Sequence, residues 1–423
     1  MKPKTLPLFV FLFSFLISFS QQELNQDQMR WTKGWTNFDP NHEDYPKPEE
    51  KLLTIIDNDA YLSNDAVYLM SGNVYVTNNA TLTIQEGTII RCDSENETSL
   101  VITKGAKLIA KGSKVNPIIF TSDKAPKSRK AGDWGGIVIA GSGKTSSPSG
   151  VGVLEGNFLP QYSVYGGTKP NEMTAILSYI RIEYAGKKIN QSKELNGLSL
   201  YALGKNSIIK NIMVSFSADD SYECYGGLAN LKNLISYKAK DDDFDLTQGY
   251  QGELFNILAV RHPYISDISG SYAIEIDGYD KKQGFSSPEL LSFVKIRNAT
   301  LINLSDRSNY QHTSAAISSK YLARLSMGES RISGFANVIK FDKSYQTYAD
   351  LEKSFSLENS IFNVHSTAVK VKYASQDDAQ KILKYNMFTT QFKNVEELFQ
   401  DPLNDENPRF SLKESLGNYT VKQ

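Results

Sequence analysis

Apolar and polar residues alternate over short runs along most of the chain, and turn residues separate the runs. The run Val74–Ile84 recurs 26 residues later as Leu100–Ala110, with apolar side chains at matching positions. Asn79 and Gly105 occupy the same corner in the two copies, where a tight or left-handed backbone favours Asn or Gly. This alternation predicts strands that direct one face inward.

A second repeat, richer in carboxylates, runs from Ser217 to Gly278. SADDSYECYGG aligns with AKDDDFDLTQG 22 residues later, which sets Glu223 over Asp245. A third copy, YAIEIDG, sets Glu275 in the same column after an insertion rich in turn residues. Repeats of 20 to 30 residues with short strands and Gly, Asn or Asp corners indicate a solenoid, and the strand content favours an all-β, single-domain parallel β-helix.

The two ends of the chain differ from this repeat. Lys2 and Lys4 precede an apolar run that ends in small residues, a pattern typical of a signal peptide. A solenoid also needs its open end covered, which predicts a cap at the C-terminus. We therefore expect a signal peptide at 1–20, an N-terminal arm or linker at 21–65, the β-helix at 66–374 and a small C-terminal cap with a short helix at 375–423.

Composition limits the classes of partner. The 423 residues carry a net charge of −1, so no global basic field favours nucleic acid. No run after the first 20 residues reaches about 18 apolar positions, so we expect no transmembrane segment in the mature chain. The two cysteines, Cys92 and Cys224, should lie several rungs apart, too far for a disulfide.

Several motifs together resemble one group of exported proteins. The segments that carry the resemblance are Val74–Gly87, Pro117–Ser122, Asp133–Gly136, Ile182–Gly186, Ser217–Asp220 and Asp242–Asp245. They resemble right-handed parallel β-helix proteins with a pectate-lyase-like fold, which are common in Bacteroidetes. The resemblance implies the fold and export, and because the group has no settled activity it transfers no catalytic residue. Many relatives end in a secretion-sorting domain for which this chain has no room, which favours the periplasm or the outer membrane.

The aligned carboxylates form a candidate site. Alternation directs Glu223, Asp245 and Glu275 outward, stacked about 4.8 Å apart from rung to rung. Like charges at this spacing raise each other's pKa or require a cation, and oxygen ligands suit Ca²⁺. The candidate metal ligands are Asp219, Asp220, Glu223, Asp241, Asp242, Asp243 and Asp245. Alternatively, these aspartates form hydrogen bonds to turn backbone and the strand carboxylates pair with Lys or Arg.

Aromatic and basic side chains extend this candidate site. Tyr225 and Tyr250 belong to a group of tyrosines around the stacked carboxylates Glu223, Asp245 and Glu275, which we call the acidic ladder. Tyrosine together with carboxylates is typical of sugar-binding surfaces, although some of these rings should fill the interior. Arg181 or Arg261 could reach the same face. The ligand-binding candidates are Glu223, Asp245, Glu275, Tyr225, Tyr250, Arg181 and Arg261.

Two functions are compatible with these residues, and the catalytic residues stay unassigned in both. The first is an extracytoplasmic binding or interaction protein, such as an outer-membrane accessory, whose ladder faces a cation, a glycan or an outer-membrane protein. The second is a polysaccharide lyase or glycoside hydrolase that acts on an acidic glycan. A cleft between the loop Ser142–Lys169 and the insertion Arg261–Gly270 would favour the enzyme.

Overall fold

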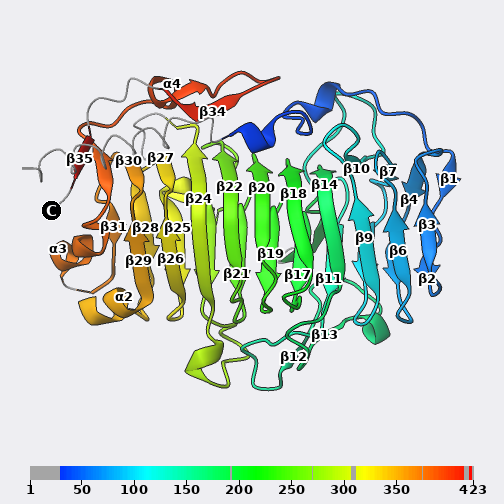
Figure 1. Ribbon diagram of the computed structural model, residues 1–423, viewed down its shortest axis with the longest axis horizontal. Coiled ribbons are helices and arrows are strands. Elements are labelled where there is room, and N and C mark those ends of the chain that lie inside the picture. The colour runs from blue at the N-terminus through cyan, green and yellow to red at the C-terminus, as the bar shows by residue number, and fades with distance from the viewer. Residues whose placement is uncertain are drawn as a thin grey trace, which may run out of the picture.

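Parallel strands from successive turns of the chain stack into three walls in the computed structural model (Figure 1). In this view the front strands run upward while the chain advances from right to left, so the β-helix is right-handed. The structure describes residues 29–423 except 191–192, 269, 306–310, 374, 414–418 and 422–423. The predicted signal peptide at 1–20 lies outside the described residues.

Two of the walls belong to one sheet, because five long strands run through both. The long strands are β14 (Ala175–Glu183), β18 (Ile208–Ser215), β20 (Leu231–Tyr237), β22 (Glu253–Arg261) and β24 (Phe293–Asn303). The first wall adds β3 (Ala60–Leu62), β6 (Thr81–Ile84), β9 (Lys107–Lys111), β26 (Arg324–Gly328) and β29 (Phe355–Glu358). The second wall adds β1 (Glu50–Lys51), β4 (Tyr68–Met70), β7 (Ile89–Cys92), β10 (Ile118–Ser122), β27 (Arg331–Phe335), β30 (Ile361–Val364), β32 (Met387–Thr389) and β35 (Tyr419–Val421).

The long strands change wall at one residue with a left-handed backbone. Asn211, Asn233, Asn256 and Asn298 occupy this position on four rungs with φ between 53° and 56°. Asn tolerates this conformation better than most residues because its short side chain bonds locally. The Nδ2 of Asn256 donates to Oδ1 of Asn233 at 2.8 Å, and Nδ2 of Asn298 donates to Oδ1 of Asn256 at 2.6 Å. The asparagines thus form a hydrogen-bonded ladder along the bend.

The third wall is a separate sheet, and it carries the acidic repeat. Its strands are β2 (Ile55–Ile56), β5 (Val74–Val76), β8 (Ser99–Ile102), β11 (Gly136–Ala140), β17 (Leu198–Tyr201), β19 (Tyr222–Tyr225), β21 (Phe244–Thr247), β23 (Ile274–Asp277), β25 (Ala315–Lys320), β28 (Asn337–Phe341) and β31 (Val369–Lys370). Tyr222 and Phe244 point inward and stack with ring centroids 4.9 Å apart. The strand alternation predicted for this region is therefore confirmed.

The N-terminal arm crosses the outer side of the second wall. It contains the short 3₁₀ helices η1 (Arg30–Thr32) and η2 (Pro40–His42), and its buried Trp35 and Phe38 pack on outward side chains of the long strands. Further along, the hydroxyl of Tyr45 donates to both oxygens of the buried Glu183, at 2.9 and 3.0 Å. The arm is thus fastened by an apolar contact and by a polar one.

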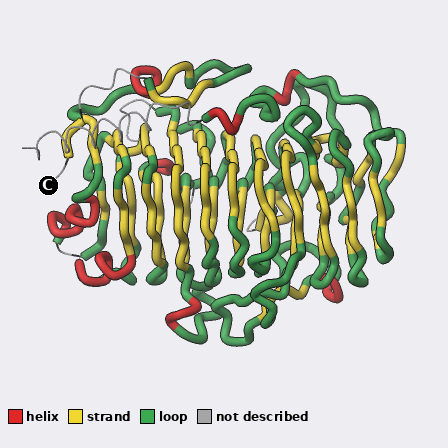
Figure 2. The backbone as a smooth tube through the Cα atoms, viewed as in Figure 1, coloured by secondary structure: helices red, strands yellow, loops and turns green. Residues whose placement is uncertain are grey.

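The C-terminal segment closes the last rung and then folds back over the second wall (Figure 2). The helical elements near this end are α2 (Tyr348–Ser354), α3 (Gln376–Ala379), η6 (Gln380–Leu383) and α4 (Val395–Leu398). A hairpin of β33 (Phe399–Asp401) and β34 (Arg409–Leu412) reaches the N-terminal arm, where the rings of Phe38 and Phe410 lie 5.9 Å apart. The arm and the β33–β34 hairpin, which lie far apart in the sequence, therefore meet on one face.

Parallel pairing starts before residue 66, because β1 pairs with β4 and β2 pairs with β5. The segment expected as an arm at 21–65 thus supplies the first rung as well. Two further hairpins lie outside the stacked rungs, β12 (Val151–Val153) with β13 (Val164–Gly166), and β15 (Lys188–Asn190) with β16 (Lys193–Glu194). The remaining 3₁₀ helices are η3 (Pro160–Tyr162), η4 (Pro288–Leu290) and η5 (Gln311–Thr313).

Cys92 and Cys224 are both buried and unbridged, as expected. Within the described ranges, no helix has the length and apolar character needed to cross a membrane.

Candidate functional site

The third wall aligns the carboxylates in one column. Glu223 of β19 pairs with Asp245 of β21, and Asp245 pairs with Glu275 of β23. Ser199 and Ser318 occupy the same column on the rungs before and after. The register expected from the 22-residue repeat is therefore the register of the structure.

The carboxylates are much less accessible than an outer face would suggest. Glu223 and Glu275 are each only 9% exposed. The segment expected as a protruding loop, Ser142–Lys169, instead packs its β12–β13 hairpin against the wall, where the ring of Tyr165 lies 4.7 Å from that of Tyr201. Tyr201 in turn stacks on Tyr225 at 3.9 Å. The ladder therefore lies in a partly desolvated setting beside this aromatic cluster.

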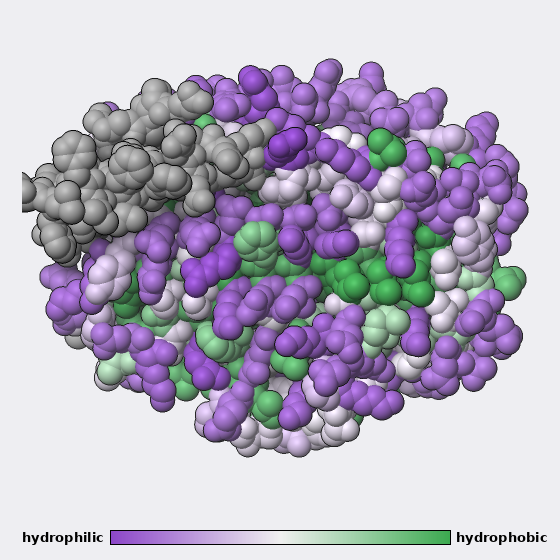
Figure 3. All heavy atoms as spheres, viewed as in Figure 1, coloured by the Kyte–Doolittle hydropathy of each residue, from purple (hydrophilic) through white to green (hydrophobic). Residues whose placement is uncertain are grey.

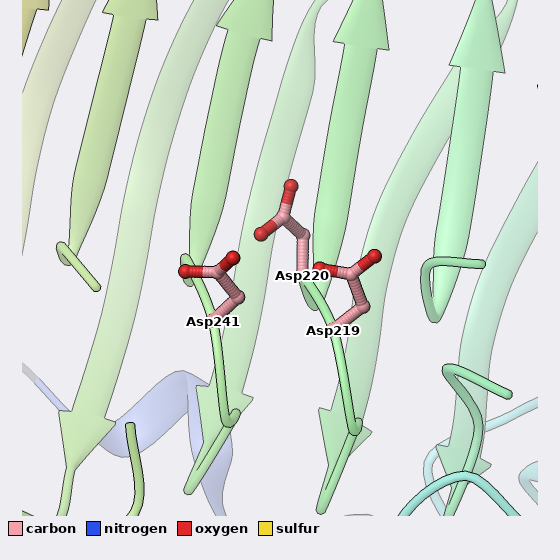
Figure 4. A group of neighbouring side chains, drawn as sticks. All are labelled: Asp219, Asp220 and Asp241. Atoms are coloured by element: carbon pink, nitrogen blue, oxygen red, sulfur yellow. The ribbon is translucent and has the colours of Figure 1, made fainter. Parts of the chain in front are cut away.

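Two overlapping groups of carboxylates bring their oxygens close enough to share a cation. One contains Asp219, Asp220 and Asp241, and the other contains Asp220, Glu223 and Asp245; within each group the oxygens lie within 4.8 Å of one another. Figure 4 shows the first group, with Asp219 and Asp220 on one rung and Asp241 on the next. Ca²⁺ binds oxygens at about 2.3–2.6 Å, so two ligands of one ion are at most about 5 Å apart. The clustered carboxylates could therefore hold a metal ion.

Burial and mutual repulsion perturb these groups strongly. Burial raises the pKa of Asp220, Glu223 and Asp245 well above the usual range, and neighbouring carboxylates raise each pKa further. Burial, followed by the charge of Asp267, raises the pKa of Asp241 to about 6. At 4.8 Å and an effective dielectric constant near 20, two ionised carboxylates repel by about 3–4 kcal/mol. The fully ionised cluster is therefore costly without a cation.

Hydrogen bonds satisfy only some of the carboxylate oxygens of the ladder. Glu223 accepts from Nδ2 of Asn196 at 2.5 Å and from the hydroxyl of Tyr225. Oδ1 of Asp245 is buried and has no hydrogen-bond partner. Within the described part of the chain, no Lys, Arg or His forms an ion pair with Asp220, Glu223 or Asp245. The N-terminal half of the ladder thus holds unneutralised oxygens directed at one another.

The C-terminal half of the ladder contains its own cation. The Nζ of Lys320 contacts the carboxylate of Glu275 and lies 4.0 Å from Oδ1 of Asp277. Although burial opposes it, these two carboxylates raise the pKa of Lys320, so the ammonium stays charged. Burial raises the pKa of Asp277 to about 7 even with Lys320 beside it. Neither Lys320 nor Asp277 was expected from the sequence. Lys320 was missed because the repeat loosens after Gly278, and its pairing with Asp277 on β23 is the signal that could have found it. Asp277 lies inside the third repeat copy, next to the column that was singled out.

Two of the seven candidate metal ligands fall outside both groups, and Asp220 within them also makes a turn bond, because its Oδ1 accepts the backbone N–H of Asp242 at 2.7 Å. Asp242 accepts the backbone N–H of Tyr272 at 2.5 Å, which joins neighbouring rungs as the turn alternative predicted. Asp243 faces the interior, where it binds Arg261 at 3.0 Å and accepts from the hydroxyl of Ser236. The two groups that could hold an ion therefore use only Asp219, Asp220, Glu223, Asp241 and Asp245.

Three ligand-binding candidates lie away from the ladder. Arg181 belongs to the second wall, where its Nε is 3.5 Å from Oε1 of Glu183. Arg261 is fully buried against Asp243, and Tyr250 fills the core while its hydroxyl donates to the carbonyl of Ala229 at 2.7 Å. Arg261 and Tyr250 are therefore interior side chains, and Arg181 lies on a different wall from the ladder. Tyr225 does lie at the ladder, through its bond to Glu223.

Comparison with known proteins agrees with this architecture. A family model described as a pectate-lyase-like β-helix domain matches residues 54–398. The chain belongs to this β-helix family. No curated protein and no solved structure matches the chain significantly. Membership in the β-helix family accounts for the three walls, and the acidic ladder has to be interpreted from its own geometry.

Proposed function

We propose that this protein is an extracytoplasmic binding module whose acidic ladder holds a divalent cation, with Ca²⁺ as the ion. The observation that carries the proposal is the convergence of Asp220, Glu223 and Asp245, whose oxygens lie within 4.8 Å of one another with one buried oxygen left unpartnered. An all-oxygen site on fixed strands is the donor set that hard cations prefer.

The contrast between the two halves of the ladder supports this proposal. Lys320 forms an ion pair with Glu275 beside Asp277, whereas no cation among the described residues forms an ion pair with Asp220, Glu223 or Asp245; the charge of Lys320 only lowers the pKa of Asp245 from a distance. A bound ion at Asp220, Glu223 and Asp245 would give the N-terminal half the neutralisation that the C-terminal half already has. The signal-peptide pattern supports an exported location, where millimolar Ca²⁺ suits weak extracellular sites.

The alternative enzyme loses support from the same geometry. A lyase needs a basic side chain beside the metal. The two arginines that could have reached the ladder are bound elsewhere, Arg181 to Glu183 and Arg261 to Asp243, and Lys320 is bound to Glu275. The hairpin expected to wall a cleft instead packs on the wall beside the ladder. We therefore favour a binding role for the site.

Thermal unfolding with excess Ca²⁺ and with chelator tests the cation site. An ion held only by the folded state stabilises it by RT ln(1 + [L]/Kd), about 2.7 kcal/mol at a hundredfold excess over Kd. We expect Ca²⁺ to raise the Tm of the wild type and to have little effect on the double variant Glu223→Gln with Asp245→Asn. The control double variant Asp57→Asn with Glu352→Gln removes two exposed carboxylates away from the ladder and should keep the full response. An equal response in all three proteins would refute the site.

A further inference from the structure

A row of exposed cations runs along the outer side of the first wall, away from the acidic ladder. Lys111, Lys210, Lys232 and Arg297 share one column of outward positions on this wall. The rungs between them contribute Ser178 and Phe255 to the column. We call the four cations the basic row. Six rungs at about 4.8 Å give it a length of about 24 Å along the axis of the solenoid.

The basic row is unneutralised by the chain itself. All four side chains are exposed, and in the described ranges none of them forms an ion pair. In the adjacent column, Glu253 is bound to Lys295 at 3.0 Å. The column of the row itself continues past Arg297 through Gly328 to the exposed Glu358, which forms no ion pair with the row in the described residues. The protein as a whole has a net charge of −1, so this run of like charges is a local feature and does not reflect a basic composition.

The register makes this arrangement costly without a partner. Lys210 and Lys232 are direct neighbours on β18 and β20, and like charges that face each other across strands destabilise a sheet. Exposed strand positions accept many polar residues, so packing does not require lysine here. An external anion would convert the repulsion into attraction.

Apolar side chains lie between and beside the cations. Phe255 is 42% exposed within the column, and Ile208 is 45% exposed in the next one. The ammonium of Lys232 lies 5.2 Å from the ring centroid of Phe255. Figure 3 shows hydrophobic and hydrophilic side chains side by side on this face of the molecule. Flat apolar side chains between charges suit the carbon face of a sugar ring together with its acidic groups.

We propose that the basic row binds an extended anionic polysaccharide, laid along the axis of the β-helix. The cations follow a single line and recur with the rung spacing, so a linear polymer with regularly spaced carboxylates can meet several of them at once. This surface lies on the first wall, whereas the acidic ladder is on the third. The two proposals are therefore independent.

Binding to polygalacturonate in the presence of EDTA tests the basic row, because the chelator prevents Ca²⁺ from bridging the polymer to the acidic ladder. We expect the wild type to bind polygalacturonate, to bind more weakly as salt is added, and not to bind neutral dextran. The triple variant Lys210→Gln, Lys232→Gln and Arg297→Gln should bind about tenfold more weakly, since each exposed contact contributes modestly. Its Tm should stay near that of the wild type because the three side chains are exposed.

A matched control removes the same charge elsewhere. The triple variant Lys130→Gln, Lys281→Gln and Lys282→Gln changes three exposed lysines outside the first wall and should alter the affinity less than twofold. An equal loss in both triple variants, or no binding by the wild type, would overturn the proposal. Binding to phosphatidylglycerol vesicles that depends on the row, without binding to polygalacturonate, would overturn it as well and would assign the row to a membrane surface.

Discussion

Lys320 reaches one rung back to Glu275, so a side chain of the protein occupies the position that a cation would take beside this carboxylate. The same ammonium lies 4.0 Å from Asp277. On the two preceding rungs of the same column, Glu223 and Asp245 form no ion pair with any described residue, although the charge of Lys320 lowers the pKa of Asp245. The ladder therefore has an ion-paired lysine beside Glu275 and no ion pair at Glu223 and Asp245 among the described residues.

Replacing this lysine should make both halves depend on an added ion. We expect Lys320→Gln to lower the free energy of unfolding in chelator by about 1–3 kcal/mol, because Glu275 and Asp277 lose their buried partner. Ca²⁺ should then stabilise the variant more than the wild type, which thermal scans at several Ca²⁺ concentrations measure. Lys295→Gln is the control, since Lys295 forms an ion pair with Glu253 at 3.0 Å on the first wall, away from the ladder. Equal behaviour of the two variants would contradict this role for Lys320.

The raised carboxyl pKa values predict how stability depends on pH. The pKa of Asp241 is raised to about 6 and that of Asp277 to about 7, in both cases chiefly by burial, whereas an unfolded Asp titrates near 3.9. The folded protein therefore holds more protons between these values, and its stability falls as the pH rises from about 4 through 7. We expect the Tm in chelator to be lower at pH 8 than at pH 5, and excess Ca²⁺ to reduce the difference.

The Asp277→Asn variant serves as the control for this pH dependence. It cannot ionise at this position, so the decrease in Tm between pH 5 and pH 8 should be smaller than in the wild type. A decrease of the same size in the variant would show that other groups cause the effect.

The interior pair of Arg261 and Asp243 should contribute to stability and leave ion binding intact. Both side chains are fully buried, with 3.0 Å between Nη1 and Oδ2. Arg261→Met leaves a buried carboxylate without its partner, which costs about 3–5 kcal/mol. We expect a large drop in Tm, while the Ca²⁺ response of the protein that still folds is retained. Loss of the response at unchanged Tm would instead place Arg261 at the ladder.

The asparagine ladder at the bend can be tested at its middle member. Asn256 has φ of 56° and bonds to asparagines on both sides. We expect Asn256→Ala to destabilise the fold by about 2–3 kcal/mol, because it loses the side-chain bonds and forces alanine into a left-handed conformation. Asn256→Gly keeps the conformation accessible and should cost less. The difference between the two Tm values separates backbone strain from hydrogen bonding, and identical values would exclude a strain contribution.

The register of the ladder could be predicted because it depends only on local repetition. Glu223 and Asp245 stand 22 residues apart in segments with the same alternation, and parallel rungs with equal turns must place them side by side. The burial of the ladder carboxylates could not be predicted in the same way. The covering hairpin β12–β13 comes from a segment without the repeat, and its contact between Tyr165 and Tyr201 depends on the path of the whole loop.

The misplaced arginines have a different cause. Spacing identifies which residues share a column, but it does not say which wall that column belongs to. Arg181 falls on the second wall, and Arg261 ends a long strand at a corner where its side chain turns into the interior. Lys320 was missed because longer insertions separate the later rungs, so its match with Asp277 is visible only after the strands are paired.

The arm described above sets an order of events during synthesis. Trp35 and Phe38 lie early in the chain, yet their rings contact those of Tyr179 and Tyr237, at 5.8 and 5.0 Å between centroids. The same apolar cluster also contains Leu258 and Ile302. Phe410, made near the end of synthesis, completes the contact with Phe38. Early rungs can form as they emerge, whereas the leading segment has to wait for most of the polypeptide before it can dock. This early segment thus reaches its final position late, and a nascent chain stopped before Tyr179 would lack the rungs that these two aromatic side chains cover.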